Sequence, residues 1–419
     1  MIKKIVFITT HNWDSKRQGG FHKFAEAACL SGIESVFFSF PRPYYGLFMN
    51  REQLNKDVIK TLSKGKYYDV QLPKINEEQT DIFDEKASDF YVQGGKEKSK
   101  KLLNITYPTF RFPDSAGRFL NDKLMNWLLM HSFKSFKKFC KKYFSGTDCF
   151  VFESCEGIAF IDKLKKYFPD AKMIYRPSDP MVYATVPQRV KKLEKNILYK
   201  ANLSLIVNEE GVNYYKKTIT DFENKVHYEI LSNGIDIASY TKKYPVPQIL
   251  QKPNTVLYVG AWEVEWKLLF LAAETNPDFN YIVVCPNYPS SAIQKKVCQF
   301  KNLFYVPGIK PQEVPAWITN CNVVMVPYQT DFYKDRPLGI TAKYYQAMAA
   351  KKPIVAYCDT PKLKDAGINV NYSYEDFISE IQSAMTKGSC TYKFDLQGRN
   401  WNEICKRFIK ACEKNHENH

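Results

Sequence analysis

The chain has 419 residues, and its 60 lysines and arginines exceed its 44 aspartates and glutamates by 16. This length favours two or three domains. The 45% of hydrophobic and 15% of aromatic residues exclude wholesale disorder. The excess of positive charge predicts an anionic partner, which is a nucleic acid, an acidic membrane surface or a phosphorylated substrate.

The cysteines and the apolar segments indicate a cytosolic protein. The 11 cysteines occur singly and form no CxxC pair, which favours reduced thiols over a disulfide framework. The apolar stretch that follows Met1 is too short for a signal-peptide core, and no window approaches the roughly 18 apolar residues of a membrane-spanning helix. Because the 6 histidines show no paired ligand spacing, we expect no structural metal site.

In the first half of the chain, short β-rich runs alternate with helical patterns, as in parallel βαβ units. The predicted strands are 4–10, 33–40, 148–153, 172–176 and 203–208, and the predicted helices are 21–31, 157–167 and 187–199. Residues 41–118 are rich in proline and aromatic residues. We expect an irregular insertion there, at one edge of the first domain.

A second βαβ series follows a Pro-rich polar segment at 236–253, which is typical of a linker. Its predicted strands are 255–261, 280–285, 303–306, 322–327 and 353–357. The pattern predicts an α/β protein of two Rossmann-like domains that face each other across a cleft, with residues 1–236 and 237–397. Residues 398–419 are expected to form a C-terminal helix that packs back toward the first domain. Such sheets bind ligands beyond the carboxyl ends of their strands.

The loop 11–20 follows the first strand and offers several groups to a ligand. Gly19 and Gly20 let the backbone approach closely, and the next helix presents its N-terminal N–H groups to an anion. With His11, these residues predict contact with an acceptor or a phosphate. An ordinary βα loop would look the same, and the absence of a GxGxxG pattern disfavours NAD binding.

Asp179 follows a predicted strand in YRPSDPM, where a carboxylate at a cleft suits a general base. Ser-Asp-Pro is also turn chemistry, so a purely structural role stays open. Glu153 and Glu156 end the preceding strand and are the rival bases. Glu209 and Glu210 follow another strand, where they can contact a donor substrate or serve as a first-turn acidic pair favoured by the helix dipole.

Residues 331–355 link a predicted strand to the next through a helix that starts near Ile340. Lys343 and Gln346 lie three apart and share one face of that helix. Lys343 would balance the charge of a diphosphate, and the Gln346 amide can contact a ribose or a phosphate oxygen. The helix N-terminus adds partial positive charge, and Arg336 lies in the loop before it.

The stretch 119–144 is amphipathic, with phenylalanines on one side and lysines on the other. Basic amphipathic helices lie on anionic membranes, although a core helix with a solvated lysine face gives the same pattern. Nucleic-acid binding would use the same charge. No helix-turn-helix, zinc-finger, RRM or KH signature accompanies it, so no specific nucleic-acid partner is expected.

Several segments together resemble glycosyltransferases of the GT-B fold. These are SNGID (232–236), VGAWEVEWKLL (259–269), FYVPGIKPQEVPAWITNCNVVMVPY (304–328) and AKYYQAMAAKKPIVA (342–356), the last being similar to the donor motif. With HNWDSKRQGGFHK and YRPSD, the chain resembles the GumK-like glucuronosyltransferase family of xanthan and exopolysaccharide synthesis. The resemblance spans most of the chain and is weak between 41 and 118.

The resemblance assigns roles to individual residues. It implies that Asp179 is the base and that Lys343 and Gln346 bind the donor diphosphate and nucleotide. Trp262 would fall in the first donor-domain loop, and Glu209 or Glu210 would take the acidic donor position. A uronate donor would need a cation near its carboxylate, for which Arg336 or Lys343 serves.

Retaining members of the fold usually carry two glutamates with seven residues between them, whereas this chain has Leu338 and Gln346 at the expected positions. We therefore predict an inverting, metal-independent glycosyltransferase that moves a sugar from a UDP-linked donor to a lipid-linked glycan. It would need no cofactor and work at the cytoplasmic face of the membrane, as a peripheral protein on anionic lipid. The alternatives are a nucleotide-sugar epimerase of the same fold and a non-catalytic basic scaffold that binds membrane or nucleic acid.

Overall fold

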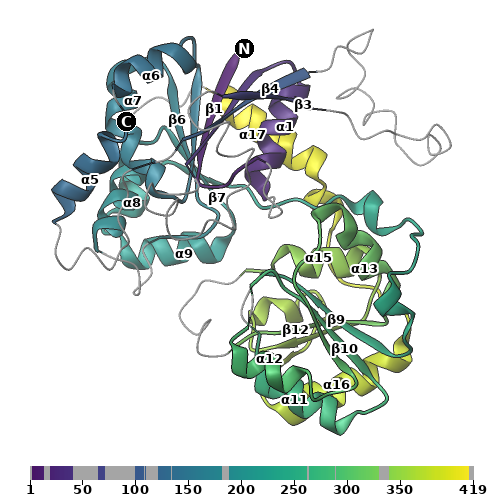
Figure 1. Ribbon diagram of the computed structural model, residues 1–419. Helices are drawn as coiled ribbons and strands as arrows, with labels where there is room; N and C mark the ends of the chain where they lie inside the picture. Colours follow the sequence, from purple (N-terminus) through teal and green to yellow (C-terminus); the bar gives the residue numbers. More distant parts are fainter. Residues whose placement is uncertain are drawn as a thin grey trace. The chain divides into compact units, whose positions relative to one another are not determined.

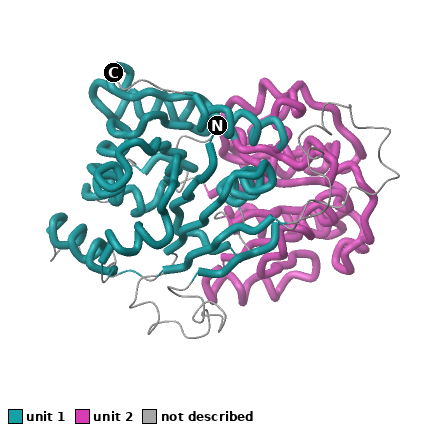
Figure 2. The backbone as a smooth tube through the Cα atoms, turned by 90° about the horizontal axis from the view of Figure 1, so that it is seen from above, with its two compact units in different colours: residues 1–232, 402–419 teal, residues 233–401 magenta. Residues whose placement is uncertain are grey.

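The structure is a computed structural model of the whole chain. It describes residues 2–13, 19–40, 65–70, 100–107, 109, 121–133, 135–181, 188–261, 264–287, 289–329 and 339–414. The chain divides into two compact units, coloured separately in Figure 2. Unit 1 comprises Met1–Ser232 and Asn402–His419, and unit 2 comprises Asn233–Trp401.

Unit 1 is built on an eight-stranded sheet with the order β3-β4-β2-β1-β5-β6-β7-β8. Its strands are β1 (Lys4–Thr9), β2 (Glu34–Ser39), β3 (Lys66–Val70), β4 (Lys100–Thr106), β5 (Cys149–Glu153), β6 (Lys172–Arg176), β7 (Leu203–Ile206) and β8 (Tyr228–Ile230). All neighbours pair in parallel except β3, which runs antiparallel to β4 at the edge.

Helical segments connect the strands of unit 1 and cover its sheet (Figure 1). They are α1 (Gly20–Leu30), α5 (Asp122–Met130), α6 (Phe136–Tyr143), η4 (Glu156–Phe160), α7 (Ile161–Tyr167), α8 (Gln188–Lys200), α9 (Glu209–Thr218), α10 (Phe222–Lys225) and α17 (Trp401–Glu413). None of the described helices combines the length and the apolar character needed to cross a membrane.

The central strands of unit 1 are apolar on both faces, as expected for a parallel sheet between two helical layers. In β1, Val6 and Ile8 join the cluster formed with Phe144 and Phe160. Successive side chains of a strand point to opposite faces. Phe7 accordingly lies on the other face, where its ring centroid is 6.0 Å from that of Phe408 of α17.

The last helix, α17, packs its apolar stripe on unit 1. Ile404, Phe408 and Cys412 are fully buried, at the i, i+4 and i+8 spacing of one helix face. Phe408 stacks on Phe24 of α1 with 4.4 Å between ring centroids. The C-terminal helix therefore completes the layer that α1 begins.

Unit 2 holds a six-stranded sheet, all parallel, in the order β11-β10-β9-β12-β13-β14. The strands are β9 (Thr255–Val259), β10 (Asn280–Val284), β11 (Leu303–Val306), β12 (Val323–Pro327), β13 (Ile354–Tyr357) and β14 (Val370–Asn371). Its helical segments are η5 (Ile237–Tyr240), η6 (Gln248–Gln251), α11 (Trp266–Thr275), α12 (Ser291–Val297), η7 (Pro311–Glu313), α13 (Val314–Asn320), α15 (Ala342–Ala349), η8 (Pro361–Lys364), α16 (Tyr374–Lys387) and η9 (Gln397–Arg399).

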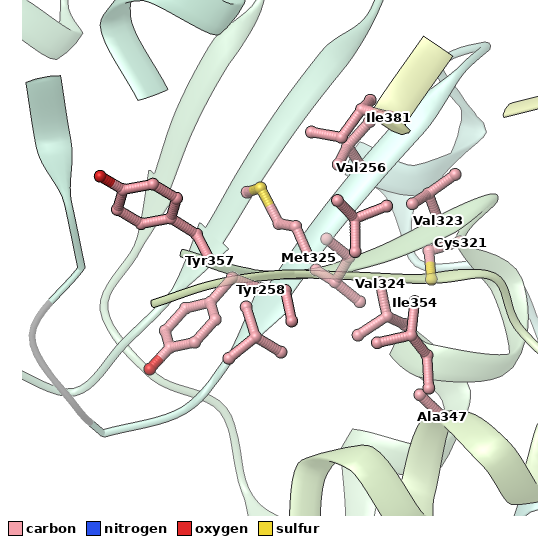
Figure 3. Close-up of a cluster of buried hydrophobic side chains, with 14 of the residues drawn as sticks. Val256, Tyr258, Cys321, Val323, Val324, Met325, Ala347, Ile354, Tyr357 and Ile381 are labelled. Atoms are coloured by element: carbon pink, nitrogen blue, oxygen red, sulfur yellow. The ribbon is translucent and has the colours of Figure 1, made fainter. Parts of the chain in front are cut away.

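In unit 2, α13 and α15 lie on one face of the sheet and α11, α12 and α16 on the other (Figure 1). The core between these layers combines aliphatic side chains with tyrosines, a methionine and a cysteine, as Figure 3 shows. There Ile381 of α16 lies beside Val256 of β9, and Ala347 of α15 lies beside Ile354 of β13.

The structure corrects the prediction for 41–118 in part. Two strands, β3 and β4, lie within that range and extend the sheet beyond β2. In β4, Leu102 and Ile105 are buried on opposite faces of the strand, whereas β3 at the edge is largely exposed. The proline-rich and aromatic composition around both strands masked them in the sequence. The first unit ends at Ser232, where the sequence placed the boundary at 236, and the last helix begins at Trp401.

Replacing Phe408 with alanine tests how much α17 contributes to unit 1. Removing a fully buried phenylalanine costs about 3–5 kcal/mol through lost burial and the cavity left behind. We expect the urea midpoint of unit 1 unfolding, followed by circular dichroism, to fall clearly in Phe408→Ala. Lys410→Ala, at an exposed position of the same helix, is the control, and equal midpoints for the two variants would contradict this role.

Candidate functional site

In unit 2, four neighbouring parallel strands end at the same edge of the sheet. Gly260 follows β9, Cys285 follows β10, Tyr328 follows β12 and Asp359 lies two residues beyond β13. Because parallel strands all end at the same edge, these residues converge. Lys343 of α15 interacts with this group and is the centre of the candidate donor site.

The ammonium group of Lys343 is enclosed by aromatic rings. It donates a hydrogen bond to the Tyr328 hydroxyl and lies 4.4 Å from the centroid of that ring and 5.3 Å from that of Tyr258. Burial lowers the pKa of Lys343 to about 8, although the nearby Asp359 and Cys285 act to raise it. A cation in such surroundings gains strongly from a bound anion.

Gly260 is required for this close packing. A Cβ at this position would lie 2.6 Å from the Tyr258 hydroxyl and 3.2 Å from Cε of Lys343. Any larger residue would therefore push the tyrosine and the lysine away from the end of β9.

The carboxylate of Asp359 stabilises the charged form of Lys343. This carboxylate accepts a hydrogen bond from the Tyr344 hydroxyl and a 2.6 Å hydrogen bond from the backbone N–H of Thr360. Burial raises the pKa of Asp359, while these hydrogen bonds and Lys343 act in the opposite direction. Tyr344 and Asp359 thus form a buried pair next to the ammonium.

The start of α15 adds donors to the same site. Its N-cap residue, Thr341, makes no side-chain cap hydrogen bond, so the cap side chain does not occupy the first-turn N–H groups. Gln346 is half-buried and lies one turn after Lys343, on the same face as predicted. A lysine, an amide and a helix N-terminus together suit a phosphate-bearing ligand.

In unit 1, the corresponding strand edge is organised around Glu153. Its carboxylate is buried at the end of β5 and accepts hydrogen bonds from the hydroxyls of Thr9 and Ser178, the latter at 3.2 Å. Nε2 of His11 lies 3.4 Å from the same carboxylate. Burial opposes ionisation, but these three donors outweigh it and lower the pKa of Glu153.

Of the residues predicted to bind an acceptor, His11 lies beside this carboxylate, whereas Gly19 and Gly20 lie at the start of α1. The side chain of His11 is 33% exposed, so part of the ring faces solvent. Gly19 is exposed and Gly20 begins α1. Nothing lies within 4 Å of a Cβ built on Gly19, so the packing of the chain itself does not require glycine there.

Asp179 is exposed two residues after Pro177, beyond the carboxyl end of β6. Arg176, the last residue of that strand, is buried and donates a 2.8 Å hydrogen bond to the carbonyl of Pro177. Burial lowers the pKa of Arg176 to about 10, although the charges of Glu153 and Asp179 act to raise it. The guanidinium therefore stays cationic at neutral pH. Both carboxylates therefore share one buried guanidinium.

The two rival bases have other partners. Glu156 forms a buried ion pair with Arg189, at 2.6 Å. Glu153 accepts hydrogen bonds from Thr9 and Ser178 and lies near Nε2 of His11. Both rival carboxylates are therefore engaged with other groups of the protein, and Asp179 as the base stays a prediction.

Glu209 and Glu210 occupy the first turn of α9, after β7. Glu209 is exposed and Glu210 is half-buried, and Asn208 caps the helix by accepting from the N–H of Gly211. Contact with a donor substrate and stabilisation of the helix start thus both stay predictions for this acidic pair.

Two predicted donor residues, Trp262 and Arg336, lie outside the described residues. Conversely, the sequence analysis missed Tyr328, Tyr258 and Asp359. Each lies in a strand or within two residues of a strand end, and only the order of the strands in the sheet shows that these ends lie around Lys343. Among the described residues, no three His, Cys, Asp or Glu side chains gather as metal ligands.

Residues 7–207 match the family model described as the N-terminal domain of the glucuronosyltransferase GumK. This match covers most of unit 1 and supports the predicted GumK-like resemblance. No curated protein matches the chain in a sequence search.

Solved structures resemble the chain over its whole length. Sucrose-phosphate synthase from Thermosynechococcus elongatus has 14% sequence identity and a TM-score of 0.64, with 98% of each chain covered. An alpha,alpha-trehalose-phosphate synthase (UDP-forming) from Burkholderia vietnamiensis has 9% identity and a TM-score of 0.62, with 98% of this chain and 99% of that one covered. These likenesses confirm the predicted GT-B fold.

The fold alone does not separate the two enzyme alternatives. The UDP-GlcNAc 2-epimerase from Methanocaldococcus jannaschii is also similar, at 11% identity and a TM-score of 0.53, with 98% of this chain and 99% of that one covered. The match of residues 7–207 to a glucuronosyltransferase domain is what favours transfer over epimerisation.

Proposed function

We propose a donor, an acceptor and a mechanism for this chain, which is a GumK-like glycosyltransferase of the GT-B fold. It transfers a sugar, with glucuronate the first candidate, from a UDP-linked donor to a lipid-linked glycan at the cytoplasmic face of the membrane. The observation that carries the donor part is Lys343, a lysine enclosed by Tyr328 and Tyr258 at the N-terminal turn of α15.

The proposed reaction inverts the anomeric carbon. The carboxylate of Asp179 takes the proton of the acceptor hydroxyl, whose oxygen attacks the anomeric carbon while the bond to the diphosphate breaks. The electron pair of that bond leaves with UDP. Lys343 and the N–H groups of α15 face the growing negative charge, so a preorganised positive field replaces a metal ion in this proposal.

The acceptor part is supported by the surface of α5 and α6. On α5, Trp127 is 53% and Leu124 39% exposed, an apolar strip with Lys123 beside it. On α6, Phe136 and Cys140 are buried in the core. Its four lysines are exposed, at positions Lys137, Lys138, Lys141 and Lys142. The helix thus has a core face and a solvated basic face, and such a basic face suits an anionic bilayer surface.

A basic cavity lies next to α5. It has a volume of about 440 Å³ and is lined mainly by α8 and α9, with Lys191, Lys192 and Lys195 along one wall. Lys192 also pairs with Asp122 of α5, at 3.3 Å, so the cavity and the exposed strip belong to connected helices. A lipid-linked acceptor that carries phosphate would find complementary charge there.

UDP binding, measured by calorimetry, tests the donor site. We expect the wild type to bind UDP at pH 7 and to lose affinity as the pH is raised through about 8 toward 9, because free Lys343 then loses its charge. Lys343→Met should bind about tenfold or more weakly and show little of this pH dependence, since a charge-assisted hydrogen bond contributes roughly 1.5–3 kcal/mol. Lys351→Met, beyond the other end of α15, is the control. Wild-type-like binding by Lys343→Met would refute the assignment.

Asp179→Asn separates catalysis from donor binding. Loss of a general base costs about 10²–10⁴-fold in rate. We expect transfer from UDP-glucuronic acid to octyl glycosides to fall by that factor, with the UDP affinity unchanged. Asp170→Asn, at the opposite end of β6, is the matched control and should transfer normally. Retained activity in Asp179→Asn would place the base elsewhere, and product formed from donor alone would indicate an epimerase.

Sedimentation with vesicles tests the membrane surface. Because each lysine near an anionic surface contributes about 1 kcal/mol, replacing the four lysines of α6 by glutamine should weaken binding to phosphatidylglycerol vesicles at least about tenfold. Binding of the wild type should fall with added salt. The same replacement of four exposed lysines in unit 2, Lys267, Lys295, Lys301 and Lys351, changes the net charge equally and should have little effect. Equal losses in both variants would indicate unspecific charge attraction.

A further inference from the structure

We propose that the basic cavity between α8 and α9 binds the diphosphate that joins the acceptor glycan to its lipid carrier. The cavity lies within unit 1, whereas the candidate donor site around Lys343 lies in unit 2. The inference rests on the proposed function and deepens it, because it names the chemical group by which a lipid-linked acceptor is recognised.

The walls of the cavity carry positive charge at a spacing that suits two linked phosphates. Lys191, Lys192 and Lys195 line it from α8, and no acidic side chain lines it within the part of the chain that the structure describes. Lys191 and Lys195 lie one turn apart, about 6 Å along the helix axis, so two neighbouring anionic groups can each face an ammonium. A ligand with one small anionic group would engage only one of these two lysines.

Two of the three lysines have competing contacts that a strong anion can displace. Lys192 pairs with Asp122 of α5 at 3.3 Å, and the two side chains are 74% and 43% exposed. Exposed ion pairs of this kind add little stability. The ammonium of Lys195, an exposed residue, lies 5.5 Å from the centroid of the Tyr199 ring, which is a weak contact at an exposed site.

The helices that form the cavity are tied together from the core side. Glu194, which lies between Lys191 and Lys195 in the sequence, is fully buried and is not among the residues that line the cavity. Its Oε1 accepts hydrogen bonds from the hydroxyls of Tyr175 in β6 and Tyr215 in α9, at 2.7 and 2.5 Å. This carboxylate therefore connects α8 to α9, and such preorganised walls lower the cost of ordering the site when a ligand binds.

The cavity lies close to the segment that carries the proposed base. Pro180, which directly follows Asp179, packs against the first turn of α9, since a Cβ built on Gly211 would be 3.9 Å from its Cγ. Tyr214, which lines the cavity, follows three residues later, about 4.5 Å further along the helix axis. A glycan whose diphosphate occupies the cavity can thus present a nearby sugar hydroxyl to the loop that carries Asp179.

Binding of inorganic pyrophosphate to the full chain, measured by calorimetry with saturating UDP present, tests the cavity without any transfer. We expect the wild type to bind pyrophosphate. Lys191→Gln/Lys195→Gln should bind it at least about tenfold more weakly, since each lysine offers a charge-assisted hydrogen bond. Lys163→Gln/Lys166→Gln, at two exposed positions of α7, changes the net charge equally and is the control. No binding by the wild type, or equal losses in the two variants, would overturn the proposal.

Transfer to two acceptors tests whether the bound group belongs to the acceptor. With UDP-glucuronic acid as donor, mannosyl octyl diphosphate and octyl mannoside offer the same sugar with and without a diphosphate. Lys191→Gln/Lys195→Gln should raise the KM for the diphosphate at least about tenfold more than the KM for octyl mannoside. Equal changes for both acceptors would contradict the proposal. Lysine-dependent pyrophosphate binding without transfer to either acceptor would support the diphosphate site and count against the proposed function.

Vesicle sedimentation separates the diphosphate of an acceptor from the headgroup of a bilayer phospholipid. Lys191→Gln/Lys195→Gln should bind phosphatidylglycerol vesicles as the Lys163→Gln/Lys166→Gln control does, because the two variants carry the same net charge. A loss of vesicle binding in the cavity variant alone, with pyrophosphate binding retained, would overturn the assignment in favour of a headgroup site.

Discussion

Parallel strand pairing is the constraint on which both candidate sites depend. It brings the ends of β1, β5 and β6 to one edge in unit 1, and the ends of β9, β10, β12 and β13 to one edge in unit 2. Residues that are far apart in the sequence, such as Thr9 and Glu153, thereby come within hydrogen-bonding distance. The apolar strand interiors supply the rigid core, and the polar residues directly after them supply the chemistry.

Each site contains a charge that burial disfavours. Glu153 in unit 1 is held ionised by three donors, whereas Lys343 in unit 2 has Tyr328 as its hydrogen-bond partner and a pKa lowered to about 8. The difference is physical, because a satisfied carboxylate has little to gain from a ligand and a desolvated ammonium has much. Glu153 is accordingly suited to hold other residues in place, and Lys343 to bind an anion directly.

The sequence predicted most strands to within two residues, because buried parallel strands read as continuous apolar runs between loops. The structure places Lys343 and Gln346 on one helix and Asp179 after a strand, as the sequence predicted. The sequence did not reveal that Glu153 is enclosed by donors, since that follows from which strands are neighbours. Nor did it reveal the tyrosines around Lys343, because Tyr258 and Tyr328 look like ordinary strand residues until the sheet order is known.

The two sites are complementary to the charges that move in a glycosyl transfer. Attack by a hydroxyl requires that a proton leaves the acceptor, and the exposed Asp179 offers a carboxylate in unit 1. Departure of a diphosphate requires stabilised negative charge, and unit 2 offers an ammonium and a helix N-terminus.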